Sequence, residues 1–141
     1  MSPEATFTRL GQADEPMFGP RALLVCGFPV QDQIKLLRGL SGAGSLGDLN
    51  VIFATDEDQE LVISEILDRE HRSGMGQVSP LARATIMSGC TEQEVHGLLN
   101  LFKTLRFTPQ LMATLTPTSA QWSLEDLLTE MNRERATLAG L

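Results

Sequence analysis

The chain has 141 residues, of which 42% are hydrophobic and 21% are charged, the balance of a globular protein with a core of its own. Its formal net charge of −7 argues against a nucleic-acid backbone or an anionic membrane surface as its partner. No apolar run reaches the ~18 residues of a membrane span, and two cysteines are too few for a disulfide framework, so we expect a cytoplasmic protein.

The first half of the chain predicts one strand–helix–strand–helix unit over residues 21–72. Residues 1–20 combine prolines and glycines without an apolar period, which is typical of a flexible N-terminal arm. The apolar run 22–26, which ends at Gly27, predicts a buried strand. The spacing of apolar residues then predicts a helix over 30–40, a loop over 41–48, a strand over 49–55 and a helix over 58–69.

The same pattern returns in the second half, over residues 83–141. A stretch rich in Gly, Ser and Pro over 73–82 predicts a linker between the halves. After it, strands are expected over 84–88 and 110–116, and helices over 92–105 and 124–138. Thr91 and Glu94 have the spacing of a capping box, which supports the start of the helix at residue 92.

The two halves also align residue by residue, which predicts an internal duplication. The matched pairs are Gly27 with Gly89, Leu36-Leu37 with Leu98-Leu99, Thr55 with Thr116, Leu61 with Trp122, and Ile66-Leu67 with Leu127-Leu128. Each strand–helix–strand step predicts two neighbouring parallel strands. We therefore expect an α/β fold of four strands and four helices in two or three layers, with a ferredoxin-like α+β arrangement as the alternative.

Trp122 precedes a serine that is suited to cap the last helix. In that position Trp122 and Leu127 have the spacing of a hydrophobic staple, with Ser123 as the N-cap. The staple gives the tryptophan a structural role. A role in binding a ligand or partner stays open as the alternative.

The last fifty or so residues carry a pattern that resembles a known family. The residues that carry it are Gly89, Leu98-Leu99, Ala113, Thr116, Trp122-Ser123-Leu124, Leu127-Leu128 and Glu134. They resemble a small bacterial family known only as domain of unknown function 3783. The first half follows this pattern only through the internal repeat, with Leu61 in place of the tryptophan. Because the family has no assigned activity, the resemblance implies neither a mechanism nor a catalytic residue.

Three short motifs are candidates for a chemical role. The stretch 42–47 matches G-x-G-x-x-G, but it follows a helix and precedes a strand, the reverse of a dinucleotide-binding turn. The acids 56–58 could hold a hard cation but equally suit a first helical turn, and the matched residues 117–119 are uncharged. Cys90 directly precedes a helix start, which could lower its pKa. We predict no metal and no cofactor.

Two classes of function remain. The first is a non-enzymatic interaction or regulatory module that binds an unknown protein or a second copy of itself, because no catalytic constellation is evident. The second is a small enzyme or ligand-sensing domain that uses the turns after the strands, where ligands of α/β sheets bind. The candidate binding residues are Gly27, Phe28, Thr55, Asp56, Gly89, Cys90, Thr91, Thr116 and Trp122.

Overall fold

The computed structural model describes residues 15–138, which form four strands and four α-helices. The strands are β1 (Ala22–Cys26), β2 (Asn50–Phe53), β3 (Ala84–Ser88) and β4 (Leu111–Thr114). The α-helices are α2 (Val30–Ser41), α3 (Ile63–Ile66), α4 (Glu92–Thr104) and α5 (Leu124–Leu138). Three short 3₁₀ helices lie between them: η1 (Gly44–Asp48), η2 (Asp56–Asp58) and η3 (Ser119–Gln121). The predicted α/β class is therefore confirmed.

All four strands form one sheet in the order β2-β1-β3-β4. The strands of each half are parallel neighbours, β1 with β2 and β3 with β4, as predicted. The halves join through β1 and β3, which are antiparallel and pair Leu24 with Ile86 at the centre. This central pairing points the strands of the two halves in opposite directions.

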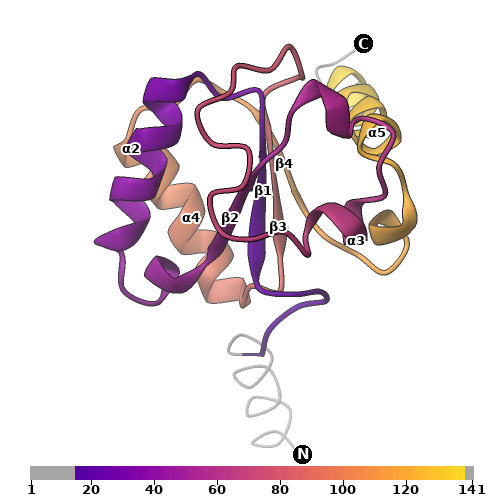
Figure 1. The fold of residues 1–141 in the computed structure, drawn as a ribbon. Helices are drawn as coiled ribbons and strands as arrows, with labels where there is room; N and C mark the ends of the chain where they lie inside the picture. The colour runs from indigo at the N-terminus through magenta and orange to yellow at the C-terminus, as the bar shows by residue number, and fades with distance from the viewer. Residues whose placement is uncertain (1–14, 139–141) are drawn as a thin grey trace, which may run out of the picture.

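The sheet lies between two helical layers (Figure 1). Helices α2 and α4 pack on one face, where their side chains join Leu23, Val25, Val51 and Met87 in one buried cluster. Helices α3 and α5 pack on the other face against Leu24, Ile52 and Ile86. Helices on both faces give three layers and exclude the ferredoxin-like alternative, in which helices cover one face.

The predicted helix over 58–69 is wrong, because only Ile63–Ile66 forms an α-helix there. Val62 has extended backbone angles and makes an antiparallel bridge to Ser123 in the other half. The amide of Ile63 donates to the carbonyl of Trp122, and the amide of Leu124 donates to the carbonyl of Leu61, both at 3.0 Å. Bonds between the halves therefore replace the helical turn that the local sequence favours.

The predicted linker over 73–82 is part of the fold rather than a free connection. The chain turns back along the outer edge of β2, and this segment runs in front of β2 in Figure 1. Arg72 donates its amide to the carbonyl of Val51 at 2.7 Å, and the amide of Phe53 donates to the carbonyl of Ser73 at 2.8 Å. We call residues 71–77 the strap.

The predicted N-terminal arm also needs correction, because its last residues bond to the core. Met17 donates its amide to the carbonyl of Cys90 at 2.9 Å, and Gly89 donates its amide to the carbonyl of Phe18 at 3.0 Å. Residues 1–14 of the arm lie outside the described residues. Within the described part, no helix is both long enough and apolar enough to cross a bilayer.

Candidate functional site at the two ends of the sheet

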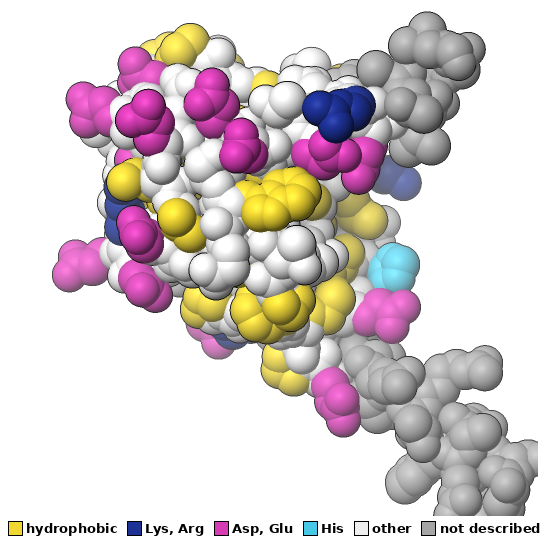
Figure 2. All heavy atoms as spheres, turned by 90° about the vertical axis from the view of Figure 1, so that its right-hand side faces the viewer, with side chains coloured by type: hydrophobic (Ala, Val, Ile, Leu, Met, Phe, Trp, Pro, Cys, Tyr) yellow, Lys and Arg dark blue, Asp and Glu magenta, His cyan; other side chains and the backbone are white. Residues whose placement is uncertain are grey.

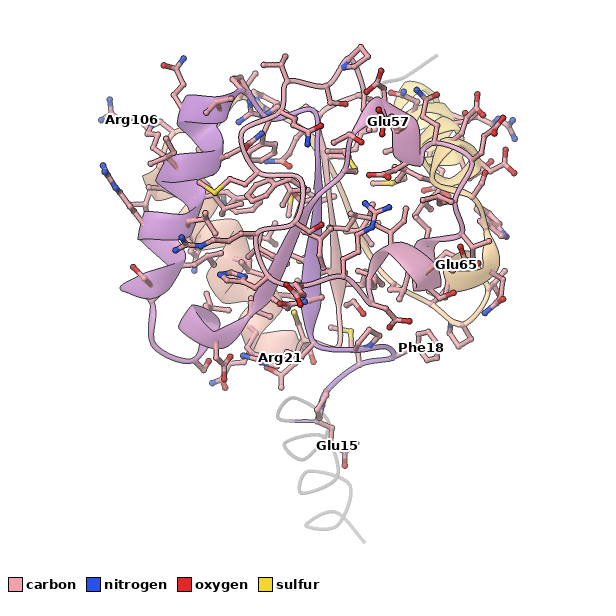
Figure 3. All side chains as sticks on the ribbon, in the orientation of Figure 1. Glu15, Phe18, Arg21, Glu57, Glu65 and Arg106 are labelled. Carbon is pink, nitrogen blue, oxygen red and sulfur yellow. The ribbon has the colours of Figure 1, made fainter. Side chains whose placement is uncertain are left out.

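The candidate turn residues do not form one site, because β1 and β3 run antiparallel. Gly27, Phe28, Thr55 and Asp56 follow β1 and β2 at one end of the sheet, which we call the first end. The residues Gly89, Cys90, Thr91 and Thr116 follow β3 and β4 at the opposite end, the second end. In Figure 3 the two ends are marked by Glu57 at the first and by Phe18 and Arg21 at the second.

The first end carries an open groove of about 590 Å³ between the start of α2 and residues 78–79, which follow the strap. Its lining is mainly apolar and consists of Gly27, Phe28, Pro29, Val30, Gln31, Ile34, Val78 and Ser79. Val78 is 77% exposed and Ile34 is 37% exposed, which is unusual for large apolar side chains. Helix α2 begins after Pro29 without a side-chain cap. The groove thus combines exposed apolar surface with an uncapped helix start.

Gln33 fixes the wall of this groove. Its side chain is 2% exposed, and its Nε2 donates to the carbonyls of Phe28 at 3.1 Å and Gln77 at 3.2 Å. Its Oε1 accepts from the amide of Gly76 at 2.8 Å. One buried amide therefore ties the end of β1 to the strap and satisfies both of its own polar atoms.

An arginine from the other half supports the floor of the groove. The Arg83 guanidinium lies 4.1 Å from the centre of the Phe28 ring and 5.4 Å from that of Phe107. Its Nη2 lies 2.9 Å from Oδ2 of Asp32 on α2. Because the Arg83 side chain is only 15% exposed, this stack positions Phe28 more than it offers a free charge to a ligand.

Thr55 and Asp56 lie beside Asp58, whose two carboxylate oxygens both accept hydrogen bonds. Asp58 accepts from Arg69 at 2.9 and 2.8 Å and from the Thr55 amide at 2.9 Å. Burial raises the pKa of Asp58, but the hydrogen bonds from Arg69 and Thr55 outweigh it and hold that pKa below its usual range. Asp56 is exposed beside this pair. Of the acids 56–58, Asp58 thus holds the turn into η2.

The second end is closed. Gly89 has φ +65°, and a side chain there would collide with the backbone of Gly19, Pro20 and Arg21. Cys90 is 1% exposed, and its thiol contacts the carbonyl of Ser88 at 3.6 Å. Burial, reinforced by the Glu94 carboxylate, raises the pKa of Cys90 to about 11. The thiolate that a place before a helix could favour is therefore disfavoured.

Thr91 and Glu94 form the predicted capping box at the second end. The amide of Glu94 donates to Oγ1 of Thr91 at 3.1 Å, and the Thr91 amide donates to Oε1 of Glu94 at 2.9 Å. Arg21 donates from Nη1 to the same carboxylate at 2.6 Å, and Ser45 donates to it at 3.1 Å. The hydrogen bonds from Arg21 lower the pKa of Glu94 to about 2. The N-terminus of α4 is thus capped, and the charge of Glu94 is paired with that of Arg21.

Two ion pairs cross between the halves, and the sequence reasoning missed both. Arg21 precedes β1 but pairs with Glu94 of the second half, while Arg83 precedes β3 but pairs with Asp32 of the first half. The alignment of Gly27 with Gly89 already superimposes these residues, because Arg83 and Glu94 each lie 62 positions after their counterparts. The repeat of an arginine before the strand and an acid in the following helix could therefore have indicated these ion pairs from the sequence.

The other candidate residues and Cys26 have structural contacts of their own. Trp122 is partly buried against the cluster under α3 and α5, and Ser123 caps α5 by accepting from the Asp126 amide at 3.1 Å. Thr116 forms a local turn with Ser119. Cys26 ends β1 opposite Ala84, at the other end of β3 from Cys90. Burial raises the pKa of Cys26 to about 12.

Residues 15–138 bring together no group of three or more His, Cys, Asp or Glu side chains able to hold a metal ion. The charged side chains of the α3 and α5 face are mostly acidic and spread over the surface (Figure 2). Because the described residues form no such cluster and the acidic side chains are scattered, the apolar groove at the first end is the best-formed candidate site.

Comparison with known proteins finds a family match within the second half. No curated protein and no solved structure matches this chain. The described part of this half holds β3, α4, β4 and α5. Residues 83–138 match the family described as Domain of unknown function (DUF3783), which confirms the resemblance over that range.

Proposed function

We propose that this protein is a non-enzymatic interaction or regulatory module of the bacterial cytoplasm, and that it binds an apolar side chain of a partner polypeptide in the groove at the first end. The observation that carries the proposal is the groove itself. Val78 and Ile34 are exposed in its lining, which also includes Phe28 and Pro29. Concave apolar surface of this kind is where protein partners place anchor residues.

The chemistry of the groove supports binding rather than catalysis. None of its eight lining residues ionises near neutral pH, so none can act there as a general base or a strong nucleophile. Ser79, the one hydroxyl, donates nothing to a base and accepts from the amide of Leu81. The buried thiols and the paired carboxylates of Asp58 and Glu94 lie elsewhere.

We also propose that the two halves descend from one duplicated unit. Support comes from the matched glycines, which both have positive φ, and from the crossed ion pairs. The bridge between Val62 and Ser123 joins matched positions as well. The bacterial setting rests on the family resemblance, and the cytoplasmic one on two free, buried cysteines.

Selection of a displayed peptide library on the purified protein tests this function. Selected peptides should share an apolar anchor, and their binding should shift the amide NMR signals of residues 27–34 and 77–79. Val78→Asp should weaken binding at least about tenfold by placing a charge against that anchor. Gln121→Asp, which adds the same charge at an exposed site on η3, should leave binding unchanged.

Two results would overturn the proposal. One is peptide binding that Val78→Asp leaves intact. The other is a response of the Val30 and Gln31 amides to small anions with no peptide selected, because that result favours the ligand-sensing alternative at the uncapped start of α2.

A further inference from the structure

The two outer edges of the sheet differ, and the difference concerns matched residues. In the first half the strap covers β2. Val51 donates its amide to Nδ1 of His71 at 3.0 Å and accepts from the Arg72 amide, while Phe53 donates its amide to Ser73. The outward amides of Val51 and Phe53 and the carbonyl of Val51 are therefore hydrogen-bonded within the chain.

In the second half, no described segment bonds to the corresponding edge of β4. The registers Ala22 with Asn50 and Ala84 with Leu111 make Met112 and Thr114 the counterparts of Val51 and Phe53. The amides of Leu111 and Leu115 donate towards β3, so the alternation of a strand turns the amides and carbonyls of Met112 and Thr114 outward. Within residues 15–138 no strap bonds to them.

The helices repeat this contrast. On α2, Leu37 lies beside Arg72 and Met75 of the strap. Its counterpart on α4, Leu99, is 36% exposed. The strap thus covers a strand edge and a leucine in the first half, and the second half leaves both uncovered. Strand β4 carries no charge or proline that would protect its edge from pairing.

We propose that a second copy of this chain covers this surface, by antiparallel pairing of β4 with β4 across a twofold axis at Ala113. Met112 of each copy would then face Thr114 of the other, so that the outward donors and acceptors complement each other. The molecule already contains this arrangement once, because β1 and β3 pair antiparallel with α2 and α4 side by side over them. The dimer continues the sheet to eight strands.

Charge complementarity favours a second copy over an unrelated strand. By helical periodicity, Glu92, Val95, Leu99 and Lys103 share the stripe of α4 next to the uncovered edge. Glu92 lies in the first turn and Lys103 in the last. Antiparallel α4 helices therefore bring Glu92 of each copy towards Lys103 of the other, with Leu99 between them.

Amide hydrogen exchange, measured together with sedimentation over a range of concentrations, tests the pairing. The Met112 and Thr114 amides should become protected as concentration rises and dimer forms. Leu111 and Leu115, which already bond to β3, should be protected at every concentration. A chain that remains monomeric, or a dimer in which Met112 and Thr114 exchange freely, overturns the proposal.

Charge reversal tests the orientation. Glu92→Lys and Lys103→Glu should each weaken the dimer about tenfold, and the double variant should regain most of the lost affinity. Glu57→Lys makes the same change in η2, which follows β2 at the opposite edge of the sheet from β4, and it should leave the dimer unchanged. Equal effects of Glu57→Lys and Glu92→Lys, or no recovery in the double variant, contradict antiparallel α4 helices. Because Val78 lies on another surface, Val78→Asp should not change the dimer, so this proposal and the peptide groove fail independently.

Discussion

The two halves of the molecule share one strand–helix–strand unit and differ in which surface their connecting segments cover. In the first half the strap closes the edge of β2, while the strand ends open into a groove. At the second half, residues 17–21 and Ser45 close the strand ends, while no described segment bonds to the outer edge of β4. The comparison teaches that the common unit supplies the core, and that segments outside it decide which surface remains for a partner.

The largest expected effect concerns the matched glycines, Gly27 and Gly89, each of which lies directly against the backbone of another segment. Gly27→Ala and Gly89→Ala should each cost about 3 kcal/mol or more in unfolding free energy, because both glycines have positive φ and each new Cβ would strike backbone. Gly44→Ala is the matched control, since its φ is +63° and nothing lies within 4 Å. Its cost should be only about 1 kcal/mol. Denaturant unfolding measures all three. If Gly27→Ala lost no more unfolding free energy than Gly44→Ala, the close approach of Leu81 and Ala82 to Gly27 would be refuted.

The second prediction separates the two crossed ion pairs. Glu94→Gln should cost up to about 3 kcal/mol, because its pKa of about 2 lies well below the ordinary value of 4.5. Asp32→Asn should cost only about 1 kcal/mol, since Asp32 is 19% exposed and meets one arginine. Similar costs for the two variants would show that the halves carry equivalent ion pairs.

The same comparison has a pH dependence. A depressed folded-state pKa gives Glu94 a stabilising effect that is complete above pH 4.5 and is lost as the pH falls towards 2. The unfolding free energy of the wild type should therefore decline over that window. In Glu94→Gln this part of the decline should be absent, whereas a decline equal to that of the wild type would assign it to other carboxylates.

The smallest expected effect sharpens the comparison on the α3 and α5 face. Ser123→Ala should cost about 1 kcal/mol, the usual value for a side-chain cap, because Ser123 accepts from the Asp126 amide. Trp122→Ala should cost about 2 kcal/mol, since the indole is only partly buried. Denaturant unfolding gives the ranking. If Trp122→Ala leaves the unfolding free energy unchanged, the indole is not needed for stability and becomes a candidate for partner binding.

The sequence predicted the elements best where local pattern and tertiary packing agree. The bounds 84–88 and 124–138 match the structure, because β3 is a fully buried run and α5 has a serine cap. The helix expected over 58–69 failed because Val62 is held extended by a bond to a residue 61 positions later. Apolar spacing alone carries no information about such a distant partner.

The site was predicted only in part, for a similar reason. Gly27 and Phe28 do line the groove, as expected for the turn after a strand. Gly89 and Cys90 lie at the opposite end of the sheet because β1 and β3 pair antiparallel, and no local motif encodes that pairing. The strap was missed because its bonds to β2 use backbone groups, which every residue possesses.

The central place of β1 has a consequence for biosynthesis. Leu24 pairs with Ile52 on one side and with Ile86, which follows it by 62 residues, on the other. At roughly 5–20 residues per second, a ribosome needs about 3–12 s to produce the second neighbour after the first strand. Throughout that interval the most apolar strand of the nascent chain has one hydrogen-bonding edge without its native partner. Chaperone binding during translation should therefore fall sharply once β3 has emerged from the ribosome.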